Sequence, residues 1–209
     1  MICFPHLRNL FRRLARSGWR NDRAAQLVEF AVALPLLVLF VVGIFDFSYA
    51  FTLKQKLTNA ARDAARAAAA DPANDLQSPA TIPASVVDAF QDIENYLVVA
   101  NKINDCGISR STPTSAGLTW TYTATTGCPP GGLGIVINRG YYFPSTSATL
   151  PSVNCTAQNP GGAGTAVIGT CVSIQYGYAW RFGRVASLLG ASSTLPNAIT
   201  VTAVAMNEN

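Results

Sequence analysis

The sequence predicts an α+β protein in which one long N-terminal helix crosses a membrane and a small antiparallel sheet follows it. An uncharged apolar run extends from Phe30 to Phe45. Helical spacing then continues without a breaker to about Ala70, and the C-terminal half alternates apolar and polar residues in short segments between loops rich in Gly, Pro, Ser and Thr. At 209 residues the chain has room for one such domain and an anchor.

Residues 1–24 form a basic leader, which we expect to lie in the cytoplasm. They carry six arginines against one acid, whereas the rest of the chain has nine Lys or Arg against ten Asp or Glu. The formal net charge of +4 therefore belongs to the leader, and the body offers no basic surface for phosphates. Nucleic-acid binding is not expected.

The apolar run is long enough for a membrane span. Crossing the hydrocarbon takes about 20 residues, so a helix from Ala25 to about Leu53 suffices. The arginines before it and the sparse charge after it place the N-terminus in the cytoplasm and the rest in the periplasm, with the chain anchored in a bacterial inner membrane. Two alternatives are a buried helix of a soluble protein and a secretory signal peptide cleaved after Ala50.

Glu29 stands beside the apolar run, where an unpaired carboxylate is costly. A cut between Ala24 and Ala25 would create an α-amine four residues before Glu29. That spacing puts the amine and the carboxylate on one face of a helix, within one chain or between neighbouring subunits. The alternative is a glutamate that reaches the membrane surface without a partner.

Three segments carry a resemblance to a known family. Arg23–Pro35, Gly43–Phe47 and Leu57–Arg66 resemble the TadE-like family, which comprises minor pilins or pseudopilins of the Tad (tight adherence) pilus, a branch of the type IV pilus machinery. The resemblance covers roughly residues 20–70. The resemblance to this family is specific only through the combination of three motifs: Val-Glu-Phe, Leu-Pro and the Asn-Ala-Ala-Arg-Asp-Ala-Ala-Arg stretch.

The resemblance implies processing and assembly residues. A prepilin peptidase would cut after Ala24, leaving Ala25 as the new N-terminus and Glu29, followed by Phe30, at the fifth mature position. Glu29 and Pro35 would then serve filament assembly. The family usually has glycine before the cut, whereas this chain has Ala24, so an uncleaved anchored form stays open.

The helical pattern predicts one continuous helix from 25 to 70, ending at Asp71-Pro72. Alanine is the strongest helix former, and small side chains allow close packing of the second half. A linker rich in Pro, Ala and Ser is expected over 71–83. A second, amphipathic helix is predicted from Ala84 to Asn101 and opens an extracytoplasmic head over 84–209.

The remaining elements are predicted to be strands of a pilin-like antiparallel sheet. Alternation and β-branched runs place them at Thr119–Thr125, Leu133–Asn138, Thr170–Phe182 and Ile199–Met206.

Five cysteines support this topology. Cys3 lies in the leader, which leaves four on the side assigned to the periplasm, where disulfides persist. Three pairings are possible. We favour Cys106 with Cys128 and Cys155 with Cys171, because each pair closes a loop of about 20 residues, worth about 3 kcal/mol in the chain-entropy model.

The chemistry-bearing residues do not indicate an enzyme. The single histidine, His6, lies in the leader, so the body has no imidazole for acid–base catalysis or for a common zinc site. We expect no cofactor, metal or small-molecule substrate. The expected function is a structural minor pilin or pseudopilin in filament initiation, assembly or adhesion, with other pilins, the prepilin peptidase and the inner membrane as partners. An uncleaved single-pass scaffold or adhesin is the alternative.

Overall fold

The computed structural model describes residues 22–72, 74, 76, 81–143, 155, 167–188 and 195–208. Residues 1–21 of the predicted leader, with Cys3 and His6, lie outside the described residues. The chain divides into two compact units. The first comprises residues 1–46 and 181–192, and the second comprises residues 47–180 and 193–209. The long helix belongs partly to each.

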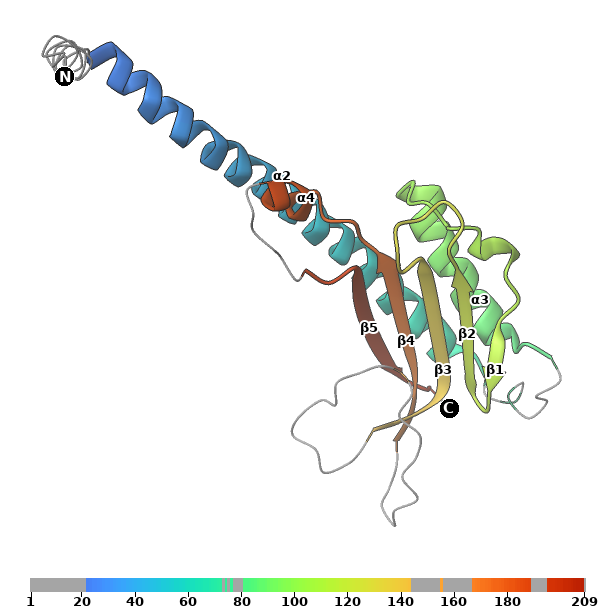
Figure 1. The fold of residues 1–209 in the computed structure, drawn as a ribbon. Helices are drawn as coiled ribbons and strands as arrows, with labels where there is room; N and C mark the ends of the chain where they lie inside the picture. Colours follow the sequence, from blue (N-terminus) through green and yellow to red (C-terminus); the bar gives the residue numbers. More distant parts are fainter. Residues whose placement is uncertain are drawn as a thin grey trace, which may run out of the picture. The chain divides into compact units, whose positions relative to one another are not determined.

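Helix α2 (Asp22–Ala70) is the longest element, with 49 residues that span about 70 Å. It is one continuous helix (Figure 1), and Pro35 lies within it. The predicted continuity from 25 to 70 is therefore confirmed. The helix ends where the sequence expected, just before Pro72.

The second unit contains a five-stranded antiparallel sheet in the order β1-β2-β3-β4-β5. Its strands are β1 (Thr114–Ala116), β2 (Thr119–Ala124), β3 (Leu133–Phe143), β4 (Val167–Gly177) and β5 (Ala198–Met206). Each strand pairs with its sequence neighbour, as in a meander. With the helices, this confirms the predicted α+β class with an N-terminal apolar helix.

One face of the sheet forms the core. The register aligns Trp120, Ile137, Val172 and Ala203 across four strands, and all four side chains are buried. Because side chains alternate along a strand, this alignment assigns the whole apolar set to one face. Helix α3 (Ala84–Glu94) and α2 from Ala50 onward contribute to the same core cluster (Figure 1).

The alanine-rich part of α2 fits closely into this core. The buried positions follow helical spacing: Ala50, Leu53, Leu57, Ala60, Ala61, Ala64, Ala65 and Ala68. Methyl side chains let the helix backbone approach its neighbours, so the run has a packing role in addition to high helix propensity.

Enlarging one of these alanines is expected to destabilise the second unit. Ala64 is completely buried, and an Ala64→Leu substitution should lower the free energy of unfolding by about 2 kcal/mol through overpacking. Ala67, three residues further on the same helix, is half-buried and provides the control, because Ala67→Leu has room to turn outward. Denaturant titration of both full-length variants in detergent checks the difference. Equal stabilities would contradict close packing at Ala64.

The second predicted helix is correct in position but not uniform. Its α-helical part ends at Glu94, and the π-helix η3 (Asn95–Ala100) continues it. The wider turn still buries Leu97. Strand β1 was not predicted, because its three exposed residues carry no apolar alternation.

The predicted strand Thr170–Phe182 is wrong at both ends. Strand β4 starts at Val167 and stops at Gly177, and helix α4 (Arg181–Leu188) begins where the strand was expected to finish. A Cβ at Gly177 would lie 2.6 Å from the Pro129 carbonyl oxygen, so the chain can pass this point only as glycine. Alternation beyond it reflects aromatic packing, since the Tyr178 ring lies 6.0 Å from that of Tyr49. Strand β3 also extends past the predicted Asn138, through a register shift, to Phe143.

The C-terminal end of α2 is capped by a buried arginine. Arg139, at the register shift in β3, is completely buried. Its Nη1 donates to the carbonyl oxygen of Ala68, and its Nη2 donates to that of Asp71 at 3.0 Å. The last carbonyls of a helix lack intrahelical donors and carry partial negative charge. The guanidinium supplies both the hydrogen-bond donors and a compensating positive charge. The Glu208 N–H adds a third bond, to Ala69 O at 3.1 Å.

Candidate functional site

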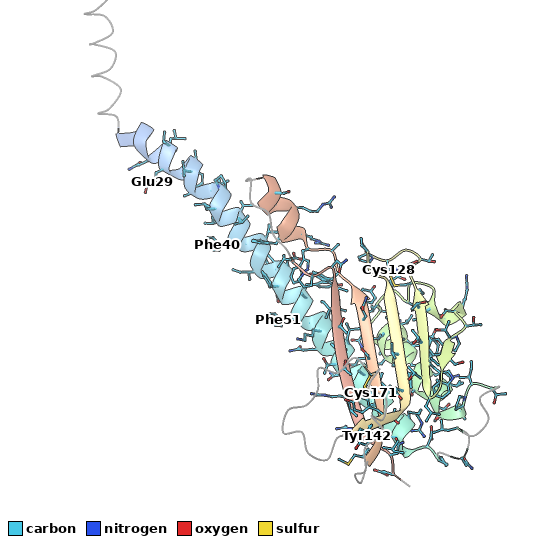
Figure 2. All side chains as sticks on the ribbon, turned by 60° about the horizontal axis from the view of Figure 1, so that its bottom comes forward. Glu29, Phe40, Phe51, Cys128, Tyr142 and Cys171 are labelled. Carbon is cyan, nitrogen blue, oxygen red and sulfur yellow. A yellow bond between two sulfur atoms is a disulfide. The ribbon has the colours of Figure 1, made fainter. Side chains whose placement is uncertain are left out.

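The N-terminal part of α2 presents an apolar surface that the first unit does not cover. Twelve large apolar side chains between Leu27 and Phe45 are exposed by 42–71%. They are Leu27, Val28, Phe30, Val32, Leu34, Leu36, Leu37, Val38, Phe40, Val41, Ile44 and Phe45. Figure 2 shows the labelled Phe40 projecting away from the helix. Among the described residues, α2 is the one helix long and apolar enough to cross a membrane, judged by length and composition.

The predicted processing and assembly residues share this segment. Ala24, Ala25, Glu29, Phe30 and Pro35 all lie in α2. The Glu29 side chain is exposed near the start of the helix (Figure 2). Four residues separate it from Ala25, just over one helical turn. An amine created at Ala25 would therefore be close to the Glu29 carboxylate, which leaves the predicted pairing geometrically open.

Asp46 has a role that the sequence did not reveal. It closes the uncharged run, yet its side chain is only 6% exposed. Its Oδ2 accepts a hydrogen bond of 2.9 Å from the Phe182 N–H, in the first turn of α4. The first N–H groups of a helix lack partners and attract negative charge, so Asp46 caps α4. A cap supplied from 136 positions away leaves no local sequence signal.

The same part of α2 receives the ring of Phe182. A Cβ at Gly43 would lie 3.2 Å from the Phe182 ring, so the absence of a side chain at Gly43 lets α4 pack closely. Gly43 and Asp46 are three residues apart and face the same side of α2. Together they hold the start of α4 against α2 within the first unit.

The second unit contains two disulfides, Cys106–Cys128 and Cys155–Cys171, with Cα–Cα distances of 5.4 Å in both. These are the pairs that the spacing favoured. The first links the segment after η3 to the β2–β3 connection, and the second links residue 155 to β4. Cys106, Cys155 and Cys171 are completely buried, whereas Cys128 is partly buried.

The turn that contains Cys106 leads us to expect a pH effect on stability. Hydrogen bonds from the Gly107 N–H (3.0 Å) and the Ser109 hydroxyl (2.9 Å) hold the pKa of the Asp105 carboxyl below its ordinary value of 3.8. A lowered folded-state pKa stabilises the fold above the unfolded value, and this contribution disappears as the pH falls through the folded value. Asp105→Asn should therefore flatten the stability curve below about pH 4 and leave its shape near neutrality unchanged. Acid titration of unfolding checks this, and an unchanged acid limb would contradict it.

Comparisons with known proteins address the N-terminal segment. Residues 24–66 match the model of a family described as TadE-like protein. The segment is similar to that family. The match confirms the resemblance drawn from the sequence and associates the segment with the Tad pilus. It includes the membrane-length part of α2 and most of the alanine-rich part, and it ends before the sheet. No curated protein and no solved structure matches the chain.

The TadE-like segment makes the anchor the candidate site. An apolar N-terminal helix and a pilus-associated family fit single-pass membrane anchoring with membrane and pilus partners. Across the described residues, no group of three or more His, Cys, Asp or Glu side chains is arranged to hold a metal ion.

Proposed function

We propose that the protein is a minor pilin or pseudopilin of a Tad-type pilus, acting in filament initiation, assembly or adhesion after a prepilin peptidase removes residues 1–24. The observation that carries the proposal is the uncovered apolar surface of α2 within the TadE-like match. Such a surface is stable in lipid or against the helices of neighbouring subunits.

The charges beside the span, the disulfides and the position of Glu29 support the proposed orientation and processing. Six arginines precede the span, so the N-terminus lies in the cytoplasm and the second unit in the periplasm. Two disulfides in the second unit suit an oxidising compartment. Glu29, which is exposed and close to Ala25 along the helix, is the group that would pair with a new α-amine, within the chain or in a neighbouring subunit.

The test is the N-terminus of the mature protein, determined by intact-mass and peptide mass spectrometry. The full chain is co-produced with the prepilin peptidase of a Tad system and recovered from membranes. A start at Ala25 is expected, and it should disappear when the peptidase is inactivated. Ala24→Gly, which restores the family's usual residue, is the matched control and should process at least as completely.

Each other outcome has a defined meaning. A chain that keeps Met1 while Ala24→Gly is cut contradicts processing of the native chain and supports the uncleaved single-pass scaffold or adhesin. Ala24 in place of glycine is the observation that keeps this second candidate open. A start at Phe51 would reject both anchored forms, because the span would have been removed as a signal peptide.

A further inference from the structure

Helix α4 has no role in the proposed function. It has eight residues, Arg-Phe-Gly-Arg-Val-Ala-Ser-Leu, and starts beside α2 through the Asp46 and Gly43 contacts described above. Arg181 and Arg184 are exposed, whereas Phe182 and Val185 are half-buried. Residues three apart share a side of a helix, so one side of α4 is cationic and another is apolar.

The α2 contacts place α4 at one end of the membrane span. Phe182 packs at Gly43, inside the uncharged run, and its N–H bonds to Asp46, which closes the run. Counting back from Asp46, about 20 residues reach Leu27, the length needed to cross the hydrocarbon. The first turn of α4 therefore lies at the boundary between the hydrocarbon and the headgroups on the periplasmic side.

Aromatic residues support that depth. Directly after Asp46 along α2, the Phe47 ring lies 5.1 Å from that of Trp180, and Tyr49 contacts Tyr178 at 6.0 Å. Phe47 is 40% exposed and Tyr49 is 64% exposed. Trp and Tyr gather at the membrane–water boundary because their rings are both apolar and polar. Trp180 also immediately precedes α4 in the chain.

The positive charge of α4 indicates an anionic partner. Within the described part of the chain, no carboxylate forms an ion pair with Arg181 or Arg184, and the sequence holds no acid between Asp105 and Glu208. A guanidinium is planar, always charged and suited to bidentate bonds with phosphate oxygens. Its aliphatic stem also tolerates the edge of the hydrocarbon.

We propose that α4 is a membrane-surface helix whose Arg181 and Arg184 bind the phosphates of anionic phospholipids on the periplasmic face. This rests on the proposed orientation of α2. The contact would fix the depth and rotation of the anchor, which a single span by itself leaves open.

The experiment uses the full chain in vesicles of phosphatidylcholine alone or mixed equally with phosphatidylglycerol. A spin label at the exposed Ser187, introduced as Ser187→Cys with Cys3→Ser, reports its depth from collisions with oxygen and with a water-soluble nickel complex. Hydrogen exchange of α4 is measured in parallel. With phosphatidylglycerol we expect a deeper label and roughly thirtyfold slower exchange, the factor that corresponds to about 1 kcal/mol for each of two cations near an anionic surface. Salt should reverse the effect.

A pair of double variants separates this contact from general attraction to the vesicle. Arg181→Gln with Arg184→Gln should abolish the lipid effect. Arg62→Gln with Arg66→Gln removes the same charge from exposed positions on α2, well beyond the span, and should leave the effect intact.

Three results would overturn the inference. They are equal depth in both lipids, equal loss in the two double variants, and protection of α4 that depends on assembly with other subunits instead of on lipid. Carbonate extraction of the same samples distinguishes this failure from failure of the proposed function. A protein that resists extraction remains an anchored protein whatever α4 does, whereas an extracted one rejects the anchor itself.

Discussion

Replacing Arg139 by methionine is expected to lower the free energy of unfolding by about 4 kcal/mol, because buried acceptors lose their donors. The guanidinium donates to two backbone carbonyls at the end of α2, to the Thr170 hydroxyl at 2.8 Å and to the side-chain Oδ1 of Asn207 at 3.4 Å. Methionine fills much of the space but donates nothing. Guanidinium-chloride unfolding of the full chain in detergent, followed by fluorescence of the buried Trp120, measures the change.

Two further variants identify the cause. Arg139→Lys keeps the charge but cannot span both carbonyls, so we expect a loss intermediate between wild type and Arg139→Met. Thr170→Val removes one of several partners and should cost only about 1 kcal/mol. If Arg139→Met were no less stable than Thr170→Val, the capping role would be rejected, and the buried arginine would contribute by packing alone.

Arg139 also shows the limit of prediction from sequence. The C-terminal end of α2, the position of α3 and the existence of the four longer strands follow from local periodicity, which is where the sequence predictions succeed. A lone arginine in an apolar strand carries no such signal, since its partners lie about 70 positions away at Ala68 and Asp71. Its burial depends on a register shift in β3, and that shift was also missed.

The end of β4 failed for a related reason. Val172, Ile174, Tyr176 and Tyr178 alternate as in a strand, and all four belong to the buried core, but only the first three lie in β4. At Gly177 the neighbouring backbone of the Pro129–Gly132 turn decides the path, which local alternation does not encode. Helix α4 then depends on Asp46 for its N-terminal cap.

The candidate site was also predictable only where its features are local in the sequence. The apolar run, the position of Glu29 and the favoured cysteine pairs are sequence-local, and the family match covers the first two. In the sequence, Asp46 marks only the end of the uncharged run. Its actual contact, the Phe182 N–H, lies in an element that was predicted to be strand.

Reducing both disulfides is expected to destabilise the second unit by about 6 kcal/mol, comparable with the whole stability of a small domain. The bridges close separations of 22 and 16 residues, each worth about 3 kcal/mol in the chain-entropy model. The two loops do not overlap in the chain, so their contributions should add. Hydrogen exchange of β2, β3 and β4 in the membrane-bound chain, with and without reductant, measures the loss.

Single-bridge variants make the result specific. Two double variants each remove one bridge: Cys106→Ala with Cys128→Ala, and Cys155→Ala with Cys171→Ala. Each variant should retain about half of the stability difference between the oxidised and the reduced protein. Alkylation mass shifts establish which bridge remains. The N-terminal part of α2 carries neither bridge, so its exchange in lipid should stay slow in every sample. If reduction left the sheet protected, the core around the alanine face of α2 would suffice without the bridges. If it released the sheet while the lipid-embedded helix stayed protected, the fold of the head would depend on an oxidising compartment, as the proposed periplasmic orientation requires.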